Sequence, residues 1–189
     1  MNGNIKIAMA GNPNSGKSTL FNALTGAHQH VGNYPGVTVE KKEGVYQLDG
    51  QAIHIVDLPG TYSLSAYSLE EVVARDFLVN EKPGAIVNIV DAANLERNLY
   101  LTTQFFELGI PVIIALNMID VAADRGIEIK SGVLEERLGV PVVPIVARSG
   151  QGIHRLMEEA VRLVKRTGEW RPKRISYGDD IDKLLLSLE

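Results

Sequence analysis

The chain has 189 residues, enough for one α/β domain with a hydrophobic core and a short appendage. It carries 19 lysines and arginines against 23 aspartates and glutamates, a net charge of −4, so we expect no nucleic-acid partner. It has no cysteine and no apolar run near the roughly 20 residues that cross a bilayer, and its first four residues lack the basic and apolar regions of a signal peptide. We therefore expect a soluble, cytoplasmic chain without disulfides or thiolate metal sites.

Apolar runs alternate with helical patterns, which is typical of an α/β fold with a mostly parallel sheet covered by helices on both faces. The six expected strands are 5–10, 39–48, 53–57, 85–90, 112–117 and 142–145. The five expected helices are 16–25, 69–80, 95–108, 132–138 and 153–166. Asp49-Gly50 predicts a hairpin between the second and third strands, which gives the sheet one antiparallel edge strand.

Two loops, 27–37 and 60–68, lack periodicity and are long enough to move. His28 and His30 lie in the first, and we interpret them as solvated, because two imidazoles without a carboxylate or thiolate make a poor metal site. Past residue 166 a linker leads into a short leucine-rich helical pattern. We therefore expect one domain over 1–167 and a linker with the start of a truncated helical domain over 168–189.

A complete phosphate loop lies between the first strand and the first helix. Gly11 to Ser18 reads G-N-P-N-S-G-K-S, which fits the pattern G-x-x-x-x-G-K-[ST]. Its glycines let backbone N–H groups curl around a phosphate, and Lys17 can reach the β- and γ-phosphates. Ser18 can ligate magnesium at the positive end of the following helix. This segment predicts a nucleoside triphosphate site.

A second phosphate-sensing motif, Asp57-Leu58-Pro59-Gly60, ends the third strand about 40 residues past the phosphate loop. Asp57 can hold magnesium through a water, and Gly60 can offer its N–H to the γ-phosphate. Thr38, which follows the first mobile loop, is the natural second hydroxyl for magnesium. Closure of Thr38 over the γ-phosphate would make a triphosphate sensor.

The segment Asn117-Met118-Ile119-Asp120 resembles the guanine-reading N-K-x-D motif of GTPases. Asp120 can accept hydrogen bonds from the ring N–H and the exocyclic amine of guanine, a donor pair that adenine lacks. Asn117 can bridge the base and the phosphate loop. Met118 replaces the lysine that usually packs over the base, which affects affinity rather than the identity of the base.

The segment Val146-Ala147-Arg148 takes the place of the S-A-K loop of GTPases. The backbone N–H of Ala147 is expected to contact the guanine oxygen. Val146 stands where that loop usually has a serine, so the match is partial.

With these motifs in order, the chain resembles the N-terminal G domain of the FeoB family of bacterial ferrous iron transporters. The family-level match rests on 31–40 (VGNYPGVTVE) and 57–64 (DLPGTYSL), with support from 68–78, 90–101 and 116–120. The resemblance covers about residues 3–167 and implies a Ras-like GTPase fold. It also implies GTP and GDP as ligands, Mg²⁺ and K⁺ as cofactors, and a partner in the family's own membrane domain, which moves Fe(II) at the bacterial inner membrane. A homo-oligomer is left open.

The resemblance also implies a site, residue by residue. The implied nucleotide contacts are Asn14, Ser15, Gly16, Lys17, Ser18, Thr19, Gly36, Thr38, Asp57, Gly60, Asn117, Met118, Asp120, Val146, Ala147 and Arg148. The implied magnesium ligands are Ser18 and Thr38, with Asp57 behind a water. The implied potassium ligands are Asn14 and the carbonyls of Gly32 and Tyr34. The residues expected to act in hydrolysis are Asn14, Lys17, Thr38 and Gly60.

One departure from Ras-like enzymes bears on the rate. Thr61 follows the Asp57–Gly60 motif where those enzymes carry a water-positioning glutamine, so we hypothesise slow intrinsic hydrolysis. Two alternatives stay open: a tRNA-modification or ribosome-assembly GTPase, and a nucleotide-dependent binding switch with negligible turnover.

Overall fold

The structure is a computed structural model that describes residues 5–166. The elements in chain order are β1 Ile5–Gly11, α1 Lys17–Thr25, β2 Gln29–Asn33, β3 Glu40–Leu48, β4 Gln51–Asp57, α2 Leu69–Glu81, β5 Ala85–Asp91, η1 Ala92–Asn94, α3 Leu95–Glu107, β6 Val112–Asn117, α4 Ile119–Asp124, α5 Ser131–Leu138, β7 Val142–Pro144 and α6 Ile153–Lys165. The expected strands and helices are all present, with small shifts at their ends. The linker and second domain predicted over 168–189 lie outside the described residues.

The strands form one sheet in the order β2-β3-β4-β1-β5-β6-β7. β4, β1, β5, β6 and β7 run parallel, and β3 is antiparallel to both of its neighbours. β1 and β5 are buried along almost their whole length, because helices cover both faces of the central sheet. The predicted α/β class and mostly parallel sheet are confirmed.

The sheet has one strand more than the six expected. β2 pairs with β3 from Gln29 opposite Gly44 to Asn33 opposite Glu40, so β2 and not β3 forms the edge of the sheet. The strand shows no apolar alternation, because nearly all of its side chains are exposed, and that is why residues 29–33 looked like a loop. Part of the segment expected to be mobile is therefore held in the sheet.

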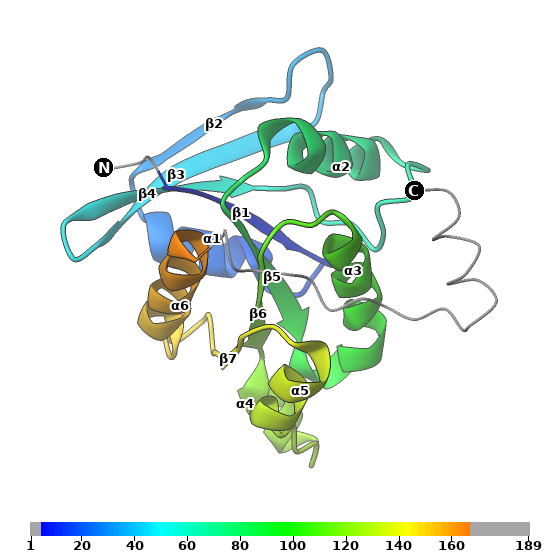
Figure 1. The fold of residues 1–189 in the computed structure, drawn as a ribbon, viewed down its shortest axis with the longest axis vertical. Helices are drawn as coiled ribbons and strands as arrows, with labels where there is room; N and C mark the ends of the chain where they lie inside the picture. The colour runs from blue at the N-terminus through cyan, green and yellow to red at the C-terminus, as the bar shows by residue number, and fades with distance from the viewer. Residues whose placement is uncertain (1–4, 167–189) are drawn as a thin grey trace.

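Helices cover the two faces of the sheet in separate layers (Figure 1). α1 and α6 pack on one face, where Phe21 and Leu156 are fully buried among strand residues. α2 and α3 pack on the other face, where Phe77 and Phe105 lie in a second apolar cluster. Burying the side chains of both layers is the main stabilising term of such a fold.

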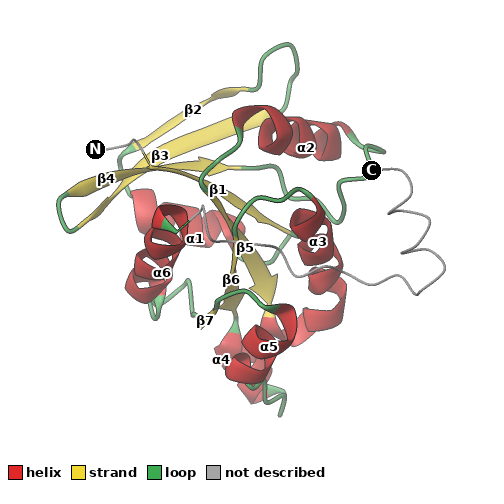
Figure 2. Ribbon diagram, viewed as in Figure 1, coloured by secondary structure: helices red, strands yellow, loops and turns green. Residues whose placement is uncertain are grey.

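The five parallel strands bring their carboxyl ends to the same edge of the sheet. The loops that follow β1, β4, β6 and β7 therefore meet there. β1 is the topological switch point of the sheet, because β4 lies on one side of it and β5 on the other. Figure 2 shows the loops between the elements in green, with the loop that joins β2 to β3 at the top of the view. Within residues 5–166, no helix is both long enough and apolar enough to cross a bilayer.

Candidate functional site

The phosphate loop is a tight turn between β1 and α1. Asn14 and Gly16 have positive φ angles of 65° and 90°, and the N–H of Ser15 donates to the carbonyl of Asn12 at 3.2 Å. A Cβ atom added to Gly16 would collide with the side-chain amide of Asn117. Glycine is thus required at position 16 both by the backbone angle and by the close approach of Asn117.

Two polar atoms of this loop are buried without a partner. Asn12 Oδ1 and Ser15 Oγ accept and donate no hydrogen bond to any described residue. Leaving buried polar atoms unpaired costs free energy, and such atoms in native structures need an explanation. Of the two atoms, the Ser15 hydroxyl can donate to an anion, as can the N–H groups at the start of α1, whereas the amide oxygen of Asn12 can only accept.

Lys17 and Asp57 bring opposite charges together beneath this loop. Lys17 Nζ lies 2.5 Å from Asp57 Oδ1, and the two side chains are only 10% and 7% exposed. Burial raises the pKa of Asp57 above its usual value, and the neighbouring Lys17 ammonium offsets part of that rise. A phosphate in the loop would compete with Asp57 for Lys17 and free the carboxylate for another cation.

The Asp57–Gly60 motif lies against the phosphate loop. Thr61 donates its backbone N–H to the carbonyl of Gly11 at 3.3 Å and is only 5% exposed. Gly60 approaches Pro13 closely, since an added Cβ would lie 3.4 Å from the Pro13 Cα. The two segments predicted to sense phosphate are therefore adjacent.

The loop over residues 60–68 is fastened to α3 and α2. Arg97 places its guanidinium 4.4 Å from the ring centre of Tyr62, and Gln104 accepts from the N–H of Leu64 at 2.7 Å. The carboxylate of Glu71 accepts from the hydroxyl of Ser63 at 2.9 Å. Sequence reasoning missed Arg97 and Gln104, because their partners lie about 35 and 40 residues away and no motif links them.

Asn117 joins the phosphate loop to the turn after β7. Its side-chain amide donates to the carbonyl of Ser15 at 2.9 Å, and its Oδ1 accepts from the N–H of Ala147 at 3.0 Å. Asn117 is 3% exposed, so both bonds are shielded from water. The N–H of Ala147, expected to face guanine, is thus engaged by Asn117 in this structure.

A pocket of about 200 Å³ opens beside this clamp. It is lined by Gly16, Thr19, Asn117, Met118, Asp120, Val121, Val146, Ala147 and Arg148. These include all six residues predicted to surround the base. Met118 has a positive φ of 61°, and its methyl group reaches toward Gly16. Asp120 Oδ2 accepts from Arg148 Nη2 at 2.7 Å at the rim.

The residues predicted to complete the magnesium and potassium sites lie in β2 and in the β2–β3 loop, which in this structure makes its own hydrogen bonds. Thr38 is exposed in the β2–β3 loop, where Tyr34 donates its N–H to Val39 and accepts from the N–H of Val37. The Tyr34 ring is buried edge-on against Phe77. Among the hydrogen bonds of residues 5–166, none joins Thr38 to the phosphate loop or Asn14 to β2.

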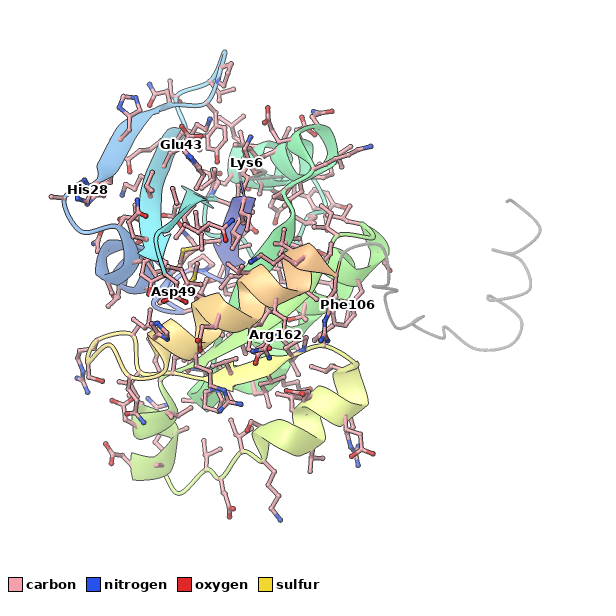
Figure 3. All side chains as sticks on the ribbon, turned by 60° about the vertical axis from the view of Figure 1, so that its left-hand side comes forward. Lys6, His28, Glu43, Asp49, Phe106 and Arg162 are labelled. Atoms are coloured by element: carbon pink, nitrogen blue, oxygen red, sulfur yellow. The ribbon has the colours of Figure 1, made fainter. Side chains whose placement is uncertain are left out.

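A pocket of about 420 Å³ lies apart from the phosphate loop, over β2, β3 and β4, and its lining includes Lys6, His28 and Glu43 (Figure 3). His30 and His54 also line it. His28 and His30, the two histidines expected in a solvated loop, therefore both border this pocket. In the described part of the chain, no three histidine or carboxylate groups are arranged to hold a metal ion.

The strand, loop and helix geometry, with a pocket beside it lined by the six residues predicted to surround a base, defines a P-loop nucleotide-binding domain of Ras-like type. A family model described as ferrous iron transport protein B matches residues 5–160, and the chain belongs to that family as its N-terminal G domain. The predicted family is confirmed.

Relatives and solved structures agree with this membership. The Fe(2+) transport protein A/Fe(2+) transporter FeoB fusion protein of Porphyromonas gingivalis is 48% identical over 186 residues, 97% of this chain and 22% of that protein. The Fe(2+) transporter FeoB of Shigella flexneri is 53% identical over 156 residues, 80% of this chain and 20% of that protein. A GDP-bound mutant of S. thermophilus NFeoB superposes with a TM-score of 0.88 at 47% identity, covering 97% of this chain and 70% of that one. The chain spans about a fifth of the length of these curated relatives.

Proposed function

We propose that this domain binds GTP and GDP, hydrolyses GTP slowly, and serves as the nucleotide switch of a longer ferrous iron transport protein. One observation supports this most: Asn117 ties the phosphate loop to the turn at 146–149 beside a pocket that carries Asp120. A base held at that pocket and a phosphate chain held at 11–18 would span one continuous site. The GDP-bound state of the S. thermophilus relative is consistent with it.

The phosphate end is served by the N–H groups of the loop and by Lys17. The close Lys17–Asp57 pair supports a magnesium role for Asp57, since Lys17 would turn to the phosphates and leave the carboxylate free. Ser18, exposed in the first turn of α1, would be a direct ligand. Thr38 would join as the second hydroxyl once its loop closes, and Gly36 would line that loop.

The base end is served by Asp120, which would accept from the ring N–H and the exocyclic amine of guanine. Met118 and Thr19 would flank the base, and the 146–148 turn would close the pocket. A pocket that presents a carboxylate to the base disfavours adenine, whose edge would leave that acceptor unpaired.

Potassium activation is the second part of the proposal. The exposed side chain of Asn14, held by a left-handed backbone at the tip of the loop, would be one ligand. The carbonyls of Gly32 and Tyr34 would be the others, which requires the β2–β3 loop to swing toward the phosphates. When bound, Mg²⁺ and K⁺ would neutralise charge that develops on the phosphate oxygens in the transition state.

Hydrolysis would proceed by attack of water on the γ-phosphorus, with cleavage of its bond to the bridging oxygen of GDP. Gly60 would donate its N–H to the γ-phosphate. The buried Thr61, fastened to Gly11, offers no long amide to orient the water, which supports a slow rate. A Thr61→Ala variant with unchanged turnover would agree, whereas a hundredfold loss would make Thr61 catalytic.

The longer protein would hold this domain at the cytoplasmic face of the bacterial inner membrane. That placement rests on the relatives, which are named as Fe(2+) transporters and are about five times as long as the part matched here. Closure of the 60–68 and β2–β3 loops over GTP would be the signal passed to the membrane part.

The first experiment measures GTP turnover by the 189-residue chain in potassium chloride and in sodium chloride at equal ionic strength. We expect potassium to accelerate hydrolysis at least tenfold and Asn14→Ala to abolish the acceleration. Asn80→Ala, at an exposed position on α2, is the matched control and should keep it. Equal turnover in both salts would refute potassium activation, and failure to bind guanine nucleotide would refute the function itself.

A further inference from the structure

Arg148 contacts the carboxylate that is proposed to read guanine. Its Nη2 lies 2.7 Å from Asp120 Oδ2, and the two side chains are 80% and 32% exposed. Both residues line the pocket of about 200 Å³. The ion pair therefore lies at the rim of the pocket, where a bound base would cover one side of it.

The backbone under Arg148 is fixed on both sides. Val146 accepts from both the N–H and the hydroxyl of Ser149, and its own N–H donates to the carbonyl of Gln151. Asn117 accepts from the N–H of Ala147 at 3.0 Å. Because these bonds hold the turn, the backbone at Arg148 has a defined position from which the side chain reaches Asp120.

Two other side chains that line this pocket, Thr19 and Asn117, carry hydrogen-bond donors, but among the described residues neither donates to the Asp120 carboxylate. Met118, Val121 and Val146 are apolar and have no hydrogen to donate. Val146 is 7% exposed and stands beside Ala147 in the turn. Among the pocket's lining residues, the hydrogen bond to the Asp120 carboxylate comes from Arg148.

Reading two donors of guanine requires a fixed carboxylate plane, since each oxygen must face one N–H. A base with a single donor does not require a fixed plane, because a carboxylate that rotates can still accept that one hydrogen bond with either oxygen. Arg148 occupies one lone-pair direction of Oδ2 and leaves the other free, so it can hold the plane without blocking the base.

We propose that Arg148 is a positioning residue that orients the Asp120 carboxylate and so sets the preference for bases with an exocyclic 2-amine. The inference rests on the proposed guanine-nucleotide function. Beyond that function, it assigns to the positive charge of Arg148 a role in recognising the two hydrogen-bond donors of guanine.

The test compares the affinities of GDP and inosine diphosphate, which lacks the 2-amine, for the wild-type chain and for Arg148→Ala. We expect Arg148→Ala to weaken GDP binding roughly three- to tenfold, and inosine diphosphate binding by less than twofold. The ratio of the two affinities should fall in the wild type as salt rises and stay constant in the variant, because salt screens an exposed pair. Arg148→Lys should restore part of the ratio, since it keeps the charge.

A matched control is Arg162→Ala on α6 (Figure 3), where Arg162 makes an ion pair with Glu159 of the same 2.7 Å length and neither residue lines the pocket. It should leave both affinities unchanged. A ratio that Arg148→Ala does not move, or tighter GDP binding by that variant, would overturn the inference. A wild-type chain that binds neither nucleotide would overturn the proposed function along with it.

Discussion

Replacing Gly16 by alanine tests the link between the phosphate loop and the base pocket. The change forces a side chain onto a backbone with φ of 90°, which costs about 1–2 kcal/mol. The new Cβ also collides with the amide of Asn117. Displacing that amide breaks its bonds to Ser15 and Ala147 and leaves buried groups unpaired, at about 1–3 kcal/mol. We therefore expect a total loss of about 2–5 kcal/mol in the free energy of unfolding.

Gly109→Ala separates the two contributions. Gly109 has a φ of 68° after α3, and an added Cβ would meet nothing within 4 Å. Its substitution should cost only the backbone term of about 1–2 kcal/mol. The difference between the two variants then measures the clamp made by Asn117.

Urea unfolding of both variants gives the free energies, and titration with GDP gives the affinities. Gly16→Ala should weaken GDP binding at least a hundredfold, whereas Gly109→Ala should leave it unchanged. Equal stabilities for the two variants, with GDP binding retained in Gly16→Ala, would refute the reasoning, because the Asn117 clamp would then tolerate the added methyl group.

Two further predictions concern stability. Lys6 donates to Glu81 at 2.8 Å and lowers the pKa of Glu81, so the pair stabilises the fold above the usual carboxyl pKa and loses that effect as pH falls through the lowered value. Glu81→Gln should cost less than about 1 kcal/mol at pH 7 and progressively less as the pH falls below the usual carboxyl pKa, which urea unfolding over a series of pH values checks. Tyr34→Ala leaves a cavity beside Phe77, so it should cost about 3–5 kcal/mol of the free energy of unfolding and speed hydrogen exchange over residues 35–39. Tyr34→Phe loses only the 3.5 Å hydrogen bond from the Tyr34 hydroxyl to the carbonyl of Asp57, so it should cost under about 1 kcal/mol. A large loss of stability in the phenylalanine variant would contradict this reasoning.

Elements with an apolar pattern could be predicted from the sequence, because burial fixes their spacing. β5 and α3 were expected almost to the residue, since their buried side chains recur as a strand or a helix demands. β2 could not be predicted, because its exposed side chains carry no pattern and its pairing with β3 holds it through the backbone. α4 was missed because six residues are too few to show a period.

The site divides in the same way. The structure brings Lys17, Asp57 and Asn117 to one edge of the sheet, because each follows or ends a strand and the carboxyl ends of parallel strands meet there. Their roles in binding remain predictions. Asn12 and Arg97 were not singled out, because Asn12 reaches a backbone carbonyl of Arg97 and no spacing encodes that contact. The same holds for the Arg148 contact to Asp120, which depends on the conformation of the turn.

Helix α3 holds both the phosphate loop and the loop over 60–68. The amide of Asn12 reaches the carbonyl of Arg97, whose guanidinium lies over Tyr62, and Gln104 holds Leu64 about two turns further on. A rigid helix moves as a unit, so a displacement of α3 caused by a contact at its exposed Tyr100 would shift both loops together. A protein that bound the exposed side of α3 would therefore change the residence time of a nucleotide in the site without contacting the nucleotide.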